Sequence, residues 1–104
     1  MEYSNRFPVH RRAYRRIRVD APAAIVRTGN SKEAVLLKDL CARGGSIISN
    51  EPLSVAERFG IIIKVYFLKM PEYREATVVW SRKIDEHVWC GGIDFGLDNM
   101  IELP

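Results

Sequence analysis

The stretch EATVVWSR (residues 75–82), followed by KIDEH (83–87) and VWCGGIDF (88–95), decides the fold class of this chain. β-Branched and aromatic residues favour a strand on either side of the charged segment, which itself favours a hairpin turn. We expect Val79 on the opposite face of its strand from Val78 and Trp80. The glycine pair Gly91-Gly92 predicts a bulge or a tight bend, as at the corner of a barrel.

Short strands are also predicted upstream of this hairpin. Polar and apolar residues alternate from residue 16 to residue 20, and residues 23–26 continue this strand. Pro22 interrupts the pattern and indicates that the strand lies at an edge or carries a bulge. Further strands are expected over residues 33–40, 46–49 and 61–68. Many short strands with frequent turns and little helix favour an all-β fold, a small six-stranded antiparallel β-barrel over residues 16–104.

Two segments outside these strands carry weak helix signals. Ser54 to Glu57 matches a capping box, but Gly60 follows so soon that at most a turn or two of helix fits. The tail from Leu97 could begin a helix capped by Asp98. Neither signal changes the all-β prediction.

The N-terminal residues 1–15 lack hydrophobic periodicity and are predicted to form a flexible basic arm. Six arginines, no lysine and no acid occur between Arg6 and Arg18, whereas the rest of the chain has an excess of acids. A guanidinium pairs bidentately with phosphate or a guanine edge and stacks on flat rings, which the lysine ammonium does not. The exclusive use of arginine therefore suggests a ligand with phosphates and planar bases.

The composition limits the class of protein. A chain of 104 residues, 47% of them hydrophobic, suits one domain with a real core. No signal peptide or membrane-spanning stretch is evident, so we expect a cytoplasmic protein without membrane insertion. Cys41 and Cys90 are expected to be reduced, and their spacing does not suit a metal site. His10 and His87 are expected to be exposed, and no catalytic constellation is evident, so we expect no enzyme and no cofactor.

Two motifs follow one another along the chain: Arg12-x-x-x-Arg16, and Asp39-Leu40-Cys41-Ala42-Arg43-Gly44-Gly45. Together they resemble the signature of the PilZ domain, RxxxR followed by (D/N)xSxxG. Residues 16–19, 76–80 and 92–95 also resemble this family, so that the similarity covers residues 10–96. The resemblance implies a barrel that serves as a bacterial receptor for the second messenger cyclic di-GMP.

The resemblance also implies which residues bind this ligand: Arg11, Arg12, Arg16, Asp39, Cys41, Gly44, Gly45 and Trp80. The arginine forks suit guanine O6 and N7 or phosphate, and a carboxylate suits the guanine N1–H and amino group. The two glycines would offer backbone N–H groups, and the indole would supply an apolar wall or a stacking surface. In similar domains, an arginine at the position of Arg11 accompanies a stacked pair of ligand molecules. Ligand binding would order the arm and signal to an unidentified downstream protein.

Cys41 departs from the family pattern, which has serine at this position. A thiol is a weak hydrogen-bond donor, so the free energy of binding cyclic di-GMP should be less favourable by about 1 kcal/mol. The departure leaves open a degenerate domain that acts as a protein adaptor without binding nucleotide. A small basic barrel that binds single-stranded DNA or RNA is a further alternative, although positive charge concentrated in the arm disfavours it. Asp39, the glycine pair and Trp80 could also serve only the turn and the core.

Overall fold

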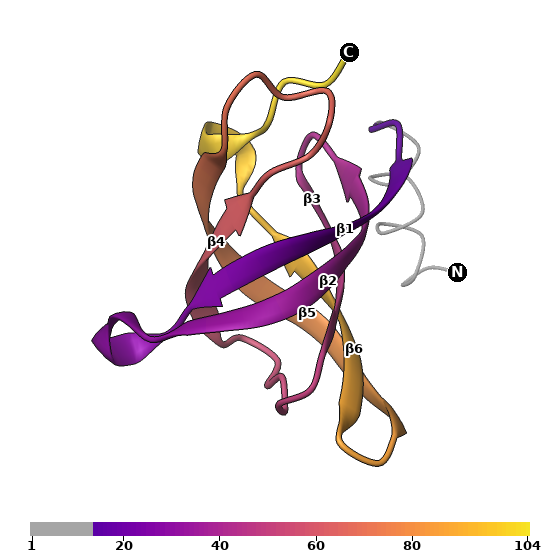
Figure 1. The fold of residues 1–104 in the computed structure, drawn as a ribbon, viewed down its shortest axis with the longest axis vertical. Coiled ribbons are helices and arrows are strands. Elements are labelled where there is room, and N and C mark those ends of the chain that lie inside the picture. Colours follow the sequence, from indigo (N-terminus) through magenta and orange to yellow (C-terminus); the bar gives the residue numbers. More distant parts are fainter. Residues whose placement is uncertain (1–13) are drawn as a thin grey trace.

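In the computed structural model, which describes residues 14–104, six antiparallel strands form one sheet that closes on itself as a barrel (Figure 1). The strands are β1 (Ile17–Val26), β2 (Lys32–Cys41), β3 (Gly44–Ser49), β4 (Arg58–Ile63), β5 (Glu72–Asp85) and β6 (Val88–Asp94). Their order is β1-β2-β3-β6-β5-β4, and pairing of β1 with β4 closes the ring. The predicted six-stranded all-β barrel is confirmed. Most of the predicted arm, residues 1–13, lies outside the described residues.

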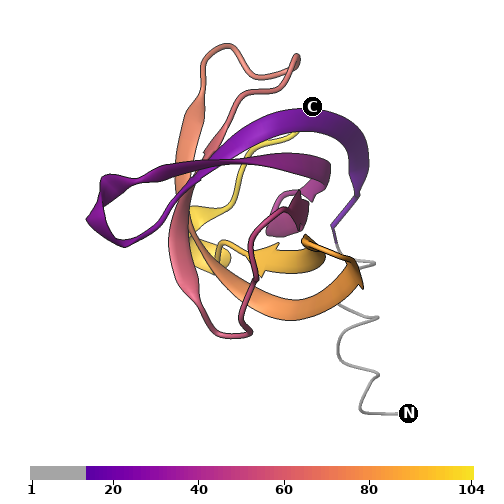
Figure 2. The same ribbon diagram turned by 60° about the horizontal axis from the view of Figure 1, so that its bottom comes forward.

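The barrel interior is filled by apolar side chains that recur at every second strand position. Figure 2 shows the strands curving around this interior. Fully buried residues come from β1, β2, β3, β4 and β5: Ile25, Leu37, Leu40, Ile47, Ile61, Ile63 and Val78. The C-terminal segment adds Ile101, which is also buried and donates its N–H to the Ala42 carbonyl at 2.8 Å. Alternation along each strand thus places one face in the core and leaves the other face available for a site.

Strand β1 carries the irregularity that Pro22 indicated. Its register against β2 shifts between Arg18 and Ala21, and Asp20 at the shift has a φ of +43°. The bulge is therefore confirmed. The alternative of an edge strand is wrong, because β1 pairs with β2 on one side and with β4 on the other.

Strand β4 is shorter than predicted. It ends at Ile63, and residues 64–71 form a loop instead of continuing the strand to residue 68. The Leu68 N–H donates to the Val65 carbonyl at 3.0 Å, which turns the chain back toward β5. Val65 is nevertheless buried. The apolar content of this segment thus indicated burial, whereas the local turn ended the strand.

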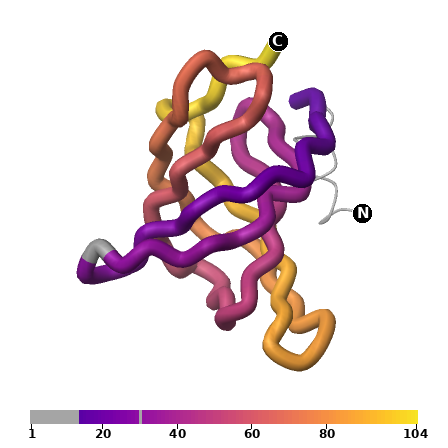
Figure 3. Tube along the Cα trace, viewed as in Figure 1, coloured from indigo at the N-terminus to yellow at the C-terminus, as the bar shows by residue number. Residues whose placement is uncertain are grey.

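The turn of the β5–β6 hairpin is shorter than predicted. Asp85 pairs with Val88, so the turn consists of only Glu86 and His87 rather than residues 83–87. His87 is exposed, as predicted, and adopts a φ of +57°. The tube in Figure 3 shows this hairpin, in orange, extending away from the end of the barrel where the C-terminus lies.

A bulge in β5 also changes the face on which Trp80 lies. The register against β6 shifts between Val78 and Trp80. Val78 is 1% exposed, whereas its neighbours Val79 and Trp80 are 46% and 39% exposed. The expectation that Trp80 shares a face with Val78 is therefore wrong, because the extra residue inverts the alternation. The bulge lies in β5, whereas the glycines that suggested it belong to the partner strand.

The two weak helix signals correspond to short turns. The Glu57 N–H donates to the Ser54 carbonyl at 3.0 Å, and the Ser54 N–H donates to Glu57 Oε1 at 3.2 Å. In the tail, the 3-10 helix η3 (Leu97–Asn99) is preceded by Gly96 rather than capped by Asp98. A second 3-10 turn, η2 (Thr28–Asn30), joins β1 to β2. Within residues 14–104, no helix combines the length and the apolar character needed to cross a membrane.

Arg27 connects three parts of the barrel at the end of β1. It donates to Glu57 Oε2 and, at 3.1 Å, to the Pro52 carbonyl, and its Nε makes an ionic contact of 2.8 Å with Glu33. The guanidinium also lies 5.8 Å from the centre of the Phe59 ring. These contacts tie the loop before β4 to the β1–β2 hairpin.

We expect Arg27→Ala to lower the free energy of unfolding by about 2 kcal/mol. Removing the cation leaves Glu33 and Glu57 without their shared partner, and their partial exposure keeps the cost below that of a fully buried pair. Urea unfolding measures the effect. Arg58→Ala is the matched control. Arg58 is exposed, and among the described residues its side chain forms no hydrogen bond or ion pair. Equal stability of the two variants would contradict this role of Arg27.

Candidate ligand-binding site

A groove crosses the outer surface of β3, β6 and β5 and reaches the start of β1. Its cavity volume is about 730 Å³, and it is lined by Tyr14, Arg16, Cys41, Arg43, Gly44, Gly45, Ser46, Val79, Trp80, Arg82, Gly92, Ile93 and Asp94. This volume falls in the range typical of sites for small organic ligands, roughly 300–1,000 Å³. Five of the eight predicted site residues line the groove and a sixth, Asp39, bonds to one of them. The other two, Arg11 and Arg12, lie outside the described residues.

Three glycines, Gly44, Gly45 and Gly92, line the groove and allow other groups to pack closely against their backbone. A Cβ on Gly44 would lie 2.0 Å from the Ile93 carbonyl oxygen, and a Cβ on Gly92 would lie 2.1 Å from Trp80 Nε1. The Trp80 indole therefore lies directly against the backbone of β6. Neither Gly44 nor Gly45 has a positive φ, so it is the close approach of neighbouring backbone that requires glycine at these two positions.

Arg16 and Asp39 meet at the rim of this groove. Arg16 Nη1 donates to Asp39 Oδ1 at 3.2 Å and to Oδ2 at 3.3 Å. Arg16 directly precedes β1, and the β1–β2 register places Arg18 opposite Asp39, so the strand pairing itself brings Arg16 close to Asp39. The side chains are 47% and 17% exposed. Both thus remain accessible from solvent while holding each other in place.

Cys41, at the end of β2, also lines the groove. It pairs with Gly44 across the β2–β3 turn and is half-buried. Cys90 is buried, and both cysteines are free thiols, as expected. Among residues 14–104, no cluster of three metal-ligating side chains is present. The residues that line the groove supply guanidinium, carboxylate, thiol, hydroxyl and aromatic groups.

The motifs did not predict three further charged residues of the groove: Arg43, Arg82 and Asp94. Arg43 Nε donates to Asp94 Oδ1 at 2.8 Å, and both side chains are 30% exposed. Arg82 is exposed on β5, and among the described residues no carboxylate pairs with it. Asp94 could have been found from the alternation of β6, which places it on the same face as Gly92. No sequence signal tells that Arg43 turns toward Asp94 rather than toward solvent.

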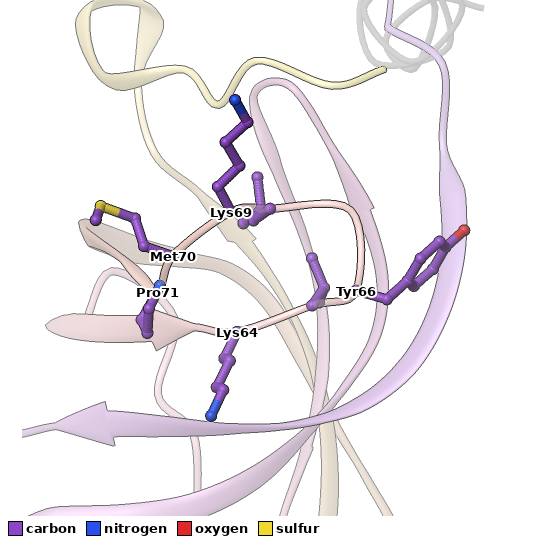
Figure 4. A pocket seen from close by; sticks show the side chains of 7 residues that line it. Lys64, Tyr66, Lys69, Met70 and Pro71 are labelled. Atoms are coloured by element: carbon purple, nitrogen blue, oxygen red, sulfur yellow. The ribbon is translucent and has the colours of Figure 1, made fainter.

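A second hollow of about 360 Å³ lies in the loop between β4 and β5. Figure 4 shows its side chains: Lys64 and Lys69 point to opposite sides of the loop, and Tyr66 and Met70 point away from each other. Binding sites place polar groups so that they converge on one ligand. The groove meets this condition, and the loop hollow does not.

No family model matches this sequence, and no curated protein matches it significantly. The choice of a ligand must therefore rest on the chemistry of the groove and on the two sequence motifs.

Proposed function

We propose that the groove binds cyclic di-GMP and that the protein is a receptor of the PilZ type. The observation that carries this proposal is the contact of Arg16 with Asp39 beside a glycine floor and an indole. These groups come from the residue before β1 and from β2, β3, β5 and β6, and each suits a different part of a guanine nucleotide. The closed six-stranded barrel is the architecture that the resemblance implies.

The Arg16–Asp39 pair has unused capacity for a ligand. Among residues 14–104, Arg16 forms hydrogen bonds through Nη1 alone, and its other N–H groups suit guanine O6 and N7 or phosphate oxygens. Each carboxylate oxygen of Asp39 can accept a second bond, from the guanine N1–H or amino group. The pair holds both groups in position before the ligand arrives, which reduces the ordering cost of binding.

Trp80 and the glycine floor suit the flat part of the ligand. Stacking of a base on an aromatic side chain contributes about 1–3 kcal/mol. Trp80 is held against Gly92 and is still partly exposed, so one surface of the indole remains open to a base. Arg82 adds positive charge for the phosphates.

Three parts of the proposal concern residues 1–13 and the partner. Arg12 would join Arg16 on the ligand, and Arg11 would favour a stacked pair of ligand molecules. Ordering of the arm over the groove would create the surface that a downstream protein binds. The resemblance favours motility, exopolysaccharide or pilus control as the process.

Isothermal titration of the whole chain with cyclic di-GMP tests the proposal. We expect a dissociation constant in the micromolar range or below, and much weaker binding of cyclic di-AMP, which has the same ring and phosphates but adenine bases. Absence of heat at high ligand concentration would contradict the proposal and favour a protein adaptor. Tight, salt-sensitive binding of a single-stranded oligonucleotide that ignores cyclic di-GMP would favour a nucleic-acid-binding barrel.

Cys41→Ser should bind cyclic di-GMP about fivefold more tightly than the natural chain. The hydroxyl is a better hydrogen-bond donor than the thiol, and one neutral hydrogen bond contributes about 1 kcal/mol. The same titration measures the change. Cys90→Ser is the control, since Cys90 does not line the groove and its replacement should leave the affinity unchanged. Equal affinity of Cys41→Ser and the natural chain would place the thiol outside the hydrogen bonds to the ligand.

A further inference from the structure

We infer that the Arg43–Asp94 pair recognises a second guanine, so that the groove selects a cyclic dinucleotide by both of its bases. This inference rests on the proposed function and adds two specificity-determining residues to it. Neither residue belongs to the invariant positions of the two motifs.

The pair is held in place by the fold on both sides. Arg43 lies in the turn between β2 and β3, and Asp94 is the last residue of β6. Asp94 is opposite Gly44 in the β3–β6 register, so no side chain stands between Asp94 and the groove at that position. The Phe95 N–H donates to the Arg43 carbonyl at 2.7 Å, and the Ile101 N–H donates to the neighbouring Ala42 carbonyl at 2.8 Å. The turn and the end of β6 are thus fixed relative to each other.

The hydrogen bonds seen among residues 14–104 leave this pair unsaturated. Arg43 uses only Nε to bond to Asp94 Oδ1, so both of its terminal amino groups and the Asp94 Oδ2 atom remain available. A guanidinium beside a carboxylate complements guanine, which has acceptors O6 and N7 on one edge and N1–H and amino donors on another. Adenine has an amino donor where guanine has O6 and lacks the N1–H, so it matches neither the fork nor the carboxylate as well.

The groove therefore has two arginine–aspartate pairs of the same kind. The Arg16–Asp39 pair lies at the start of β1, and the Arg43–Asp94 pair lies where the β2–β3 turn meets the end of β6. Arg16, Arg43 and Asp94 line the same cavity. A purely structural pair at this exposure would contribute little to stability. Two equivalent recognition elements suit a ligand whose two bases are identical.

The test compares cyclic di-GMP with the cyclic GMP-AMP of the same linkage, titrated into the natural chain and into Asp94→Asn. The mixed ligand can place its guanine at Arg16–Asp39 and must then place adenine at Arg43–Asp94. We expect the natural chain to bind cyclic di-GMP about tenfold more tightly than the mixed ligand, the discrimination of one good bidentate contact. Asp94→Asn should bind cyclic di-GMP about as weakly as the natural chain binds the mixed ligand. The affinity of this variant for the mixed ligand should differ little from that of the natural chain.

Two further variants control this comparison. Arg43→Lys keeps a positive charge beside Asp94 but lacks the planar fork, so it should also lose the preference for cyclic di-GMP. Asp98→Asn removes an exposed carboxylate that does not line the groove, and it should leave both affinities unchanged. A thermal unfolding scan of each variant verifies that the barrel is folded before titration.

The outcomes separate this inference from the proposed function. If the natural chain binds both ligands equally well, or if Asp94→Asn weakens both by the same factor, the inference is wrong and the proposed function stands. If the natural chain binds no cyclic di-GMP, the proposed function fails and the inference fails with it. If Asp94→Asn does not fold, the comparison of ligands on Arg43→Lys decides in the same way.

Discussion

Arg16→Ala should weaken the binding of cyclic di-GMP by about a hundredfold. A bidentate contact of a guanidinium with guanine or phosphate contributes up to about 3 kcal/mol, and each 1.4 kcal/mol corresponds to a tenfold change. The substitution also leaves Asp39 without its partner at the rim of the groove, where the free carboxylate repels the phosphates. Isothermal titration of the folded variant measures the loss.

Two comparisons separate this effect from a general loss of positive charge. Arg58→Ala removes the same charge from β4, outside the groove, and should change the affinity little. Asp39→Asn keeps the shape of the side chain but cannot pair with Arg16 as an anion, so it should also weaken binding. If Arg58→Ala and Arg16→Ala reduce the affinity equally, the arginine contributes only long-range attraction, and the proposed contact is wrong.

Gly44→Ala should lower the free energy of unfolding by about 3 kcal/mol. The new methyl group would lie 2.0 Å from the Ile93 carbonyl oxygen, which belongs to the backbone of the neighbouring strand and cannot rotate away. β3 and β6 would have to separate at a point where six successive residue pairs hold them together. Forcing an extra methyl group into a tightly packed place costs about 1–3 kcal/mol, and a backbone clash belongs at the upper end of that range. Urea unfolding measures the change.

Gly29→Ala is the matched control for this substitution. Gly29 has a φ of +85°, and nothing lies within 4 Å of its added Cβ, so only the backbone conformation opposes alanine there. A cost of about 1–2 kcal/mol is expected from that conformation. If Gly44→Ala is no more destabilising than Gly29→Ala, the close approach of β6 to Gly44 does not constrain this position.

The bounds of two strands were predictable. β1 and β2 lie within one residue of their predicted ranges, because a turn follows each strand. The end of β4 was not predictable, since Val65 is apolar and buried whether the chain continues as a strand or turns back. Similarly, the face of Trp80 depends on a bulge in β5 that appears only when β5 is aligned with β6.

The candidate site was predictable in part. Arg16 and Asp39 were expected to converge, and their side chains are in contact. Cys41, Gly44, Gly45 and Trp80 line the same groove. The Arg43–Asp94 contact was not expected, because these residues are far apart in the sequence and only the register of β3 with β6 places them side by side.

By itself, the sequence determined that the chain forms a small all-β barrel, because alternation and turn residues act locally. That the two motifs share one site was an expectation from their resemblance to a known family. Only the tertiary structure decided which glycines touch backbone, on which side of β5 the indole lies and which arginine pairs with which aspartate. These features depend on the register and bulges of strands that meet across the barrel. Such pairings are set by the closure of the whole sheet, which no local pattern encodes.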